Sequence, residues 1–219
     1  MRNTLKEKLA QGKKPLGTFV GTGSPAVVEC LGCAGLDFVI LDNEHSPIEA
    51  ETTADLVRAA ELRNVTPLAR VREISRPAIL KLLDVGVQGL IIPDVRTVDD
   101  VRRIVSYAKY APLGQRGFCP SRKDGWGTDP QCGVLDTMTH FNGQTLVIPQ
   151  CETAEALAEI ETIVSMEGVD GCGKTTQRAA LTGHLQKLGW RVTQTREPGG
   201  DEVAEKIRQL VLDPANTTM

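Results

Sequence analysis

The sequence predicts an α/β fold in which parallel strands alternate with helices. Three observations support this: strand-like and helix-like segments alternate five times, the strand-like segments are short and mostly apolar, and the helix-like segments repeat apolar residues about every 3.6 positions. Such alternation is typical of a parallel sheet. Periodicity does not distinguish a closed barrel from an open doubly wound sheet, so both architectures stay open at this point.

Five segments are predicted as strands. The second, residues 37–42, is an almost continuous apolar run, as expected of a strand that is buried on both faces. The full set is residues 18–20, 37–42, 67–71, 89–93 and 145–148.

Five helices are predicted to follow these strands. Ser24 before Pro25 is a typical helix start, and Thr97 with Asp100 has the pattern of a capping box. Gly35 and Gly86 are placed to end the first and third helices. The predicted helices cover residues 25–34, 53–62, 78–85, 98–108 and 157–164, and the glycine-rich residues 114–143 are predicted as a long loop.

The composition is that of a globular protein, with 219 residues of which 41% are hydrophobic and 24% charged. The net charge of −3 and the aromatic content of 4% argue against nucleic acid as a partner. Residues 1–14 contain no apolar segment typical of a signal peptide, and no stretch reaches the roughly 20 apolar residues of a membrane span. We therefore expect a cytoplasmic protein that binds neither nucleic acid nor membrane.

The sequence contains six cysteines, which are expected to be reduced in the absence of a secretory signal. Cys30 and Cys33 form a C-x-x-C motif, but no second pair completes a zinc site. Because the motif falls within a predicted helix, we expect both residues to be buried and small apolar in character, with redox or metal chemistry as the alternative.

Polar side chains follow three of the predicted strands. His45 follows the second strand, Arg70 lies at the end of the third, and Gln150 and Glu152 follow the fifth. The carboxyl ends of parallel strands meet at one edge of a sheet, where ligands bind. A histidine, an arginine and a glutamate at this edge would suit a divalent cation and an anionic substrate. The alternative is a surface histidine with solvated charges around it.

Residues 1–171 resemble the HpcH/HpaI aldolase family, which includes 2-keto-3-deoxy-sugar-acid and 4-hydroxy-2-oxoheptanedioate aldolases. The resemblance rests on several motifs that occur in one order: Asp42-Asn43-Glu44-His45-Ser46-Pro47, the Arg70 segment, residues 82–86, residues 110–117 and Gln150-Cys151-Glu152-Thr153. It implies a TIM-type (β/α) barrel, truncated here, with the activity of a class II aldehyde-lyase. The implied substrates are 2-oxo acids from which pyruvate is released.

The resemblance also implies roles for individual residues. Glu152 would bind a divalent metal, Mg²⁺, Mn²⁺ or Co²⁺, and Gln150 would support the bound 2-oxo acid. Arg70 would stabilise the pyruvate enolate, and His45, oriented by Asp84, would handle the proton of the aldol hydroxyl. These roles are chemically coherent, because a metal and a fixed guanidinium both stabilise developing negative charge, and imidazole suits proton transfer at neutral pH.

A second motif, in residues 168–175, matches the phosphate-loop pattern G-x-x-x-x-G-K-[ST] at every fixed position. Main-chain N–H groups of such a loop wrap phosphate oxygens, Lys174 would reach the β- and γ-phosphates, and Thr175 would hold Mg²⁺. The predicted nucleotide-binding residues are Gly168, Asp170, Gly171, Gly173, Lys174, Thr175 and Thr176.

Residues 167–219 resemble the beginning of thymidylate kinase. The signatures are residues 167–177 and residues 195–200, Thr-Arg-Glu-Pro-Gly-Gly. By this resemblance Asp170 would approach the sugar of a nucleoside monophosphate, and Arg196 and Glu197 would line the site near its phosphate. The implied cofactor of this part is Mg-ATP.

The two resemblances overlap at residues 167–171, Glu-Gly-Val-Asp-Gly, which both families contain. In the aldolase family a later Gly-Pro-x-Asp-Leu-Ser segment supplies the second metal ligand, and this sequence does not contain that segment. We therefore expect a hybrid of a partial aldolase barrel, residues 1–166, and a kinase fragment, residues 167–219. The main expectation is an aldolase impaired by truncation. The alternatives are an ATP-binding phosphotransferase fragment and an inactive hybrid. The aldolase family forms homo-oligomers through C-terminal helices that are not matched here, so this assembly is not expected to carry over.

Overall fold

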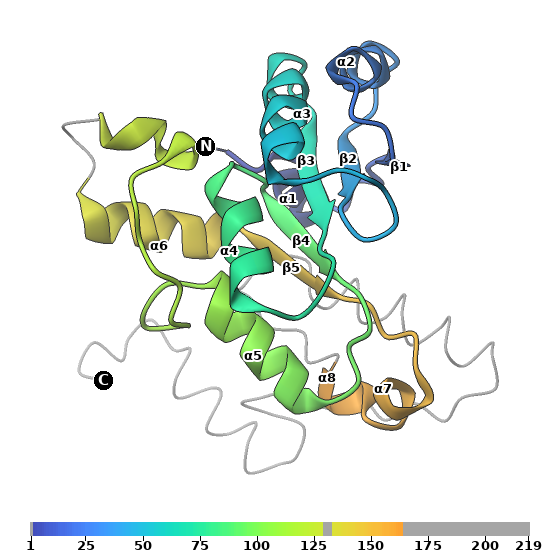
Figure 1. The fold of residues 1–219 in the computed structure, drawn as a ribbon, viewed down its shortest axis with the longest axis vertical. Coiled ribbons are helices and arrows are strands. Elements are labelled where there is room, and N and C mark those ends of the chain that lie inside the picture. Colours follow the sequence, from blue (N-terminus) through green and yellow to red (C-terminus); the bar gives the residue numbers. More distant parts are fainter. Residues whose placement is uncertain (1, 129–132, 164–219) are drawn as a thin grey trace, which may run out of the picture. The chain divides into compact units, whose positions relative to one another are not determined.

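The sheet is parallel and its strands follow one another in chain order. The computed structural model describes residues 2–128 and 133–163 (Figure 1). Within them, five strands pair in the order β1-β2-β3-β4-β5, each neighbouring pair being parallel. Right-handed crossovers that always advance in one direction place their helices on one face of a sheet, as in the wall of a (β/α) barrel. A doubly wound sheet instead reverses direction. The predicted α/β class with a parallel sheet is therefore confirmed.

The strands lie within one residue of their predicted bounds. They are β1 (Gly17–Val20), β2 (Phe38–Asp42), β3 (Thr66–Arg70), β4 (Gly89–Ile92) and β5 (Leu146–Pro149).

The helices of the described residues are α1 (Thr4–Ala10), α2 (Pro25–Cys33), α3 (Ala50–Leu62), α4 (Arg76–Asp84), α5 (Val98–Ala108), α6 (Val134–Gln144), α7 (Ala154–Ala158) and α8 (Ile160–Ile163), with a 3₁₀ segment η1 (Arg122–Gly127). In this part of the chain, no helix is long and apolar enough to cross a membrane. The predicted capping box is present: the Thr97 hydroxyl accepts from Asp100 N–H, and the Asp100 carboxylate accepts from Thr97 N–H. Ser24 occupies the N-cap position of α2, although its side chain makes no capping hydrogen bond.

The helices differ from the prediction in three regions. Residues 114–143 are not one loop, because η1 and most of α6 lie within them. The buried face of α6 is formed by Thr137 and Phe141, a pattern too polar to reveal a helix. Helix α1, which has one buried apolar residue, Leu5, was not predicted. Over residues 157–163 the predicted single helix is divided between the end of α7 and α8, which are separated at Glu159, and Val164 lies outside the described residues.

The two cysteines of the C-x-x-C motif are exposed, contrary to the prediction that they are buried. Helix α2 packs against α3 and buries Val28 completely, so its apolar contact is made on another face. Among the described residues, no group of three or more His, Cys, Asp or Glu side chains could hold a metal ion. The motif therefore contributes to no zinc site in this part of the chain.

The two faces of the sheet bury different apolar layers. Alternate residues of a strand point to opposite faces. Val39, Leu41 and Leu90 belong to the larger layer, which also contains the buried residues of α3 and α4. Ile40 and Leu68 belong to a smaller inner layer that also includes Leu5 of α1.

Gly89 is required by close packing within the inner layer. A Cβ atom at this position would lie 2.7 Å from Leu68 Cδ2 and 2.8 Å from Leu146 Cβ. Three strands therefore meet at Gly89 with no room for a side chain, which fixes how tightly β3, β4 and β5 approach one another.

Helix α1 is held at the amino edge of the sheet by Asn3. The buried Asn3 side chain accepts from Lys6 N–H at 2.9 Å and donates to the carbonyl oxygens of Gln88 and Gln144, both at 3.0 Å. One amide thus caps α1 and joins it to the start of β4 and the end of α6.

We predict that Asn3→Ala lowers the free energy of unfolding by about 2 kcal/mol, because it removes the helix cap and two buried hydrogen bonds. Urea denaturation monitored by circular dichroism measures this change. Gln11→Ala, at an exposed position after the same helix, serves as the control and is expected to change stability by less than about 0.5 kcal/mol. Equal denaturation midpoints for the two variants would contradict the prediction.

Candidate functional site

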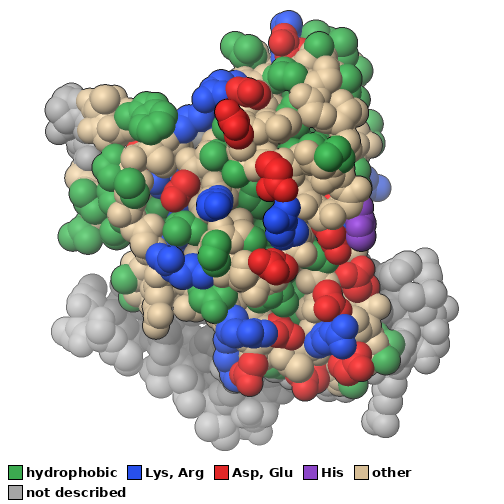
Figure 2. Space-filling view, viewed as in Figure 1, with side chains coloured by type: hydrophobic (Ala, Val, Ile, Leu, Met, Phe, Trp, Pro, Cys, Tyr) green, Lys and Arg blue, Asp and Glu red, His purple; other side chains and the backbone are tan. Residues whose placement is uncertain are grey.

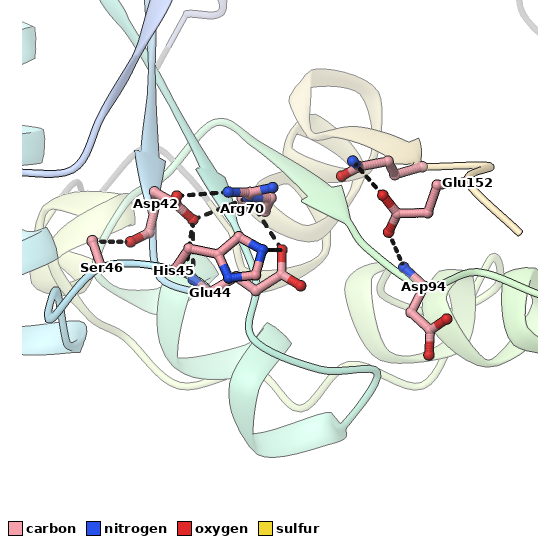
Figure 3. A network of polar contacts seen from close by, with 8 residues as sticks. Asp42, Glu44, His45, Ser46, Arg70, Asp94 and Glu152 are labelled. Carbon is pink, nitrogen blue, oxygen red and sulfur yellow. Dashed lines mark hydrogen bonds and ion pairs between the residues drawn. The ribbon is translucent and has the colours of Figure 1, made fainter.

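The carboxyl ends of β2 and β3 bring an aspartate and an arginine together. Asp42 is the last residue of β2 and pairs in register with Arg70, the last residue of β3. Their neighbours in the strands, Leu41 and Ala69, belong to the larger apolar layer on the outer face. Because successive residues of a strand point to opposite faces, the side chains of Asp42 and Arg70 lie on the inner face of the sheet. Figure 3 shows them side by side at this edge.

Asp42 and Arg70 form a two-point ion pair. Arg70 Nε donates to Asp42 Oδ1 at 3.0 Å, and Arg70 Nη2 donates to Asp42 Oδ2 at 2.6 Å. The two side chains are only 12% and 14% exposed. Hydrogen bonding to Arg70 lowers the pKa of Asp42, and the same contact raises the pKa of Arg70, with further contributions from Glu44 and Glu152. Such a pair fixes the plane of the guanidinium, and Asp42 makes no hydrogen bond to the third nitrogen, Nη1.

Asp42 also organises the turn that follows β2. Its Oδ1 accepts the main-chain N–H groups of Glu44 at 3.1 Å and His45 at 3.2 Å, and the Ser46 hydroxyl donates to the Asp42 carbonyl. This arrangement is an Asx-type turn, in which a side chain satisfies main-chain donors two and three residues further along. The position of His45 therefore depends on the same carboxylate that holds Arg70.

Glu44 lies between Arg70 and His45. Glu44 Oε2 is 3.2 Å from Arg70 Nε and 3.6 Å from His45 Nε2. The oxygen is buried and accepts no hydrogen bond from the described residues, whereas the His45 side chain is 70% exposed. The imidazole is thus accessible to a ligand at the mouth of the inner face, with a carboxylate beside it.

Glu152 follows β5 at the same edge of the sheet. Its Oε1 accepts the main-chain N–H of Asp94 at 2.8 Å, and its Oε2 accepts from Gln150 Nε2 at 2.8 Å. The charge of Glu152 contributes to the raised pKa of Arg70, so the two side chains act on each other. Gln150 Oε1 is buried and has no hydrogen-bond partner among the described residues.

The oxygen atoms at this edge are of the type that hard divalent cations prefer. They comprise the Glu152 carboxylate and Gln150 Oε1, a buried atom that has no hydrogen-bond partner among the described residues. Glu152 is a single carboxylate, consistent with the lack of a three-residue metal group in the described chain. This donor set fits Mg²⁺ or Mn²⁺ held by few protein ligands.

Of the residues predicted for the aldolase site, the structure brings His45, Arg70, Gln150 and Glu152 to one edge. It does not bring Asp84 there, which corrects the predicted contact with His45. Asp84 ends α4, which runs back from the end of β3, so Asp84 lies at the amino edge of the sheet. There its Oδ1 accepts from Arg116 Nη2 at 2.8 Å and lies 3.5 Å from Lys123 Nζ.

Two residues of the site were not given a role from the sequence. Asp42 holds Arg70 and the turn, and Glu44 adjoins both Arg70 and His45. The signal for Asp42 was present, since an aspartate at a strand end, three residues before His45, favours an Asx turn. No sequence signal identified Glu44, because its role depends on the neighbouring strand.

The predicted phosphate loop lies outside the described residues. The predicted domain boundary between residues 166 and 167 lies outside them as well. So do all the predicted nucleotide-site residues: Gly168, Asp170, Gly171, Gly173, Lys174, Thr175, Thr176, Arg196 and Glu197.

Comparison with known proteins gives a consistent result. Residues 16–212 match the protein family described as HpcH/HpaI aldolase/citrate lyase. The chain is 31% identical over 173 residues to a 2-keto-3-deoxy-L-rhamnonate aldolase of Escherichia coli O157:H7, covering 78% of this chain and 63% of the relative. It is 32% identical over 189 residues to a hydroxypyruvate/pyruvate aldolase of Deinococcus radiodurans, covering 84% and 66%.

A solved structure agrees with these matches. The crystal structure of an HpcH/HpaI aldolase from Desulfitobacterium hafniense DCB-2 superposes with a TM-score of 0.69 at 32% identity, covering 76% of this chain and 63% of that chain. The chain thus spans less than two thirds of the length of these relatives. The family match includes most of the segment that resembles thymidylate kinase.

We predict that Asp42→Asn lowers the free energy of unfolding by about 2 kcal/mol at pH 7, because it removes a charged partner of a largely buried guanidinium. The pKa of Asp42 is lowered from its ordinary value of 3.8, so this stabilisation is present above pH 3.8 and is lost as the pH falls through the folded-state value. Denaturation of both proteins between pH 7 and pH 2 measures the difference.

The control for this prediction is Asp55→Asn, which alters a pair with Arg58 whose side chains are more than half exposed. It should change stability by less than about 0.5 kcal/mol at every pH. A difference between Asp42→Asn and the unaltered chain that stays constant with pH would contradict the proposed linkage.

Proposed function

This chain belongs to the HpcH/HpaI aldolase/citrate lyase family, and we propose that it is a class II aldolase that releases pyruvate from 4-hydroxy-2-oxo or 2-oxo-3-deoxy acids. The names of its relatives, an aldolase for a deoxy sugar acid and one for pyruvate and hydroxypyruvate, support this substrate class. The observation that carries the proposal is the Asp42–Arg70 pair, which fixes a guanidinium at the mouth of the inner face, at the same edge of the sheet as Glu152.

Arg70 stabilises the charge that the reaction develops. In retro-aldol cleavage the bond between carbons three and four breaks, the aldehyde leaves, and its bonding electrons form an enolate of pyruvate. A guanidinium that is already fixed in place stabilises this enolate without reorganising during the reaction. Asp42 occupies Nε and Nη2, so Nη1 is the group that faces the substrate oxygen.

His45 moves the proton. The exposed imidazole takes the proton of the hydroxyl on carbon four as the carbon–carbon bond breaks, and a proton returned to carbon three completes pyruvate. The Asx turn built on Asp42 holds the main chain of His45 relative to Arg70. Glu44, 3.6 Å from His45 Nε2, stabilises the imidazolium that results.

Glu152 is the residue that would hold a divalent cation, and Gln150, which donates to it, offers a further oxygen atom, Oε1. When bound, such a cation supplies Lewis-acid stabilisation of the 2-oxo acid. A site with one carboxylate binds its cation weakly, because affinity rises with the number of charged ligands. We therefore expect activity only at high concentrations of Mg²⁺ or Mn²⁺.

We predict that Arg70→Lys lowers kcat/KM for pyruvate release about 100- to 1000-fold, because lysine keeps the charge but not the two-point geometry. The assay couples pyruvate to lactate dehydrogenase, with a 2-oxo-3-deoxy sugar acid as substrate and excess divalent salt. The control is Arg72→Lys, which alters a half-exposed arginine paired with Glu49 and should change kcat/KM less than about twofold.

Two results would count against the proposed function. The first is an Arg70→Lys variant as active as the unaltered chain, which would remove Arg70 from the reaction. The second is an unaltered, folded chain that releases no pyruvate from any 4-hydroxy-2-oxo acid at saturating metal.

We propose, as a second candidate, that residues 168–175 bind the phosphates of ATP in a segment of thymidylate kinase ancestry. The support is the phosphate-loop sequence, which matches at every fixed position, and the signature at residues 195–200. This function is independent of the aldolase site, since the two use different residues.

We predict that Mg-ATP at about 100 times its dissociation constant stabilises the chain by about 2.7 kcal/mol, and that Lys174→Ala removes the effect. Thermal denaturation with and without Mg-ATP measures it. Lys187→Ala, which alters a lysine outside the motif, should keep the stabilisation. The absence of any shift in the unaltered chain, or equal shifts in both variants, would rule out this candidate.

A further inference from the structure

Asp94 adopts a backbone conformation that few residues tolerate. It follows β4 and has φ of +51°, in the left-handed region. Asn64 and Trp126 are the other non-glycine residues with positive φ in the described chain. Aspartate and asparagine enter this region more readily than most residues, and β-branched residues are strongly disfavoured there. Such strain often marks a site where a precise main-chain direction is needed.

The conformation of Asp94 directs its main-chain N–H at the proposed metal ligand. This N–H donates to Glu152 Oε1 at 2.8 Å (Figure 3). Gln150 Nε2 donates to Glu152 Oε2, also at 2.8 Å. Both oxygens of the carboxylate therefore have a fixed donor, one from the end of β4 and one from the end of β5. Two donors on opposite oxygens define the rotation of a carboxylate as well as its position.

The Asp94 side chain takes no part in this contact. Its two oxygens accept from Arg96 Nε at 3.0 Å and Arg96 Nη2 at 3.3 Å, and both side chains are more than half exposed. Arg96 thereby neutralises a carboxylate that would otherwise repel Glu152. The group that meets Glu152 is thus the peptide N–H of Asp94 and not its charge.

We propose that Asp94 is a positioning residue for the aldolase reaction: its left-handed backbone holds an N–H against Glu152 and, with Gln150, fixes the carboxylate in the orientation that receives the cation. The inference rests on the proposed function of Glu152. The property that matters at position 94 is then a backbone conformation with positive φ. Glycine and asparagine can adopt this conformation, whereas a β-branched residue cannot.

The first test requires neither metal nor activity. Hydrogen exchange of the amide of residue 94, followed by NMR, should be about tenfold faster in Glu152→Ala than in the unaltered chain, because the N–H loses its acceptor. The amide of Gln150, which donates to the Ile92 carbonyl at 2.8 Å, is the internal control and should not change. An unchanged exchange rate at residue 94 overturns the inference, whether or not the chain is an aldolase.

The second test compares substitutions at position 94. Mn²⁺ affinity is measured by electron paramagnetic resonance, and kcat and KM by pyruvate release. Asp94→Gly and Asp94→Asn keep the backbone and the N–H, so both should stay within about twofold of the unaltered chain. Asp94→Val should weaken Mn²⁺ binding about tenfold and lower kcat, because valine excludes the left-handed region.

A matched control separates this effect from general strain. Asn64→Val places the same residue at φ of +56° in the turn between α3 and β3, at the amino edge of the sheet, and should lower thermal stability without altering Mn²⁺ affinity. Unaltered Mn²⁺ affinity in Asp94→Val overturns the inference. A loss of affinity in Asp94→Asn equal to that in Asp94→Val also overturns it, because the charge and not the backbone would then be required.

Discussion

The ion pair between Asp42 and Arg70 is the constraint on which the site depends. Parallel pairing of β2 with β3 places the two residues opposite each other, and the alternation of each strand directs both to the inner face. Their mutual neutralisation allows two charges to lie in a nearly buried position. The same carboxylate then anchors the turn that carries His45. Asp42 therefore fixes the position of Arg70 on β3 relative to His45, which follows β2.

The sheet could be predicted from the sequence more fully than the helices. Strands buried on both faces, such as β2, require continuous apolar runs, and such runs are easy to recognise. Helices α1 and α6 bury little apolar surface, and they are held by hydrogen bonds to distant residues, Gln88 for α1 and Tyr110 for α6. Exposure of Cys30 and Cys33 followed from which face of α2 meets α3, and periodicity does not specify that choice.

The candidate site could be predicted only where function is tied to strand ends. Arg70 ends a strand, and His45, Gln150 and Glu152 follow strands. Parallel topology brings such positions to one edge. Asp84 ends a helix, so the same topology carries it to the opposite edge, where it neutralises Arg116. The contribution of the Asp94 main chain was hidden from the sequence, because a peptide N–H belongs to every residue except proline, and only its direction distinguishes it.

The anchoring of α1 has a consequence for the order in which the chain folds. Asn3 bonds to residues 85 and 141 positions further along the chain, so its partners exist only after most of the sheet has been synthesised. Closing a loop of that length costs entropy before any contact forms. The segment around α1 is therefore synthesised before its partners but is among the last to reach its final position, and until then the inner layer around Leu68 lacks the cover that Leu5 provides.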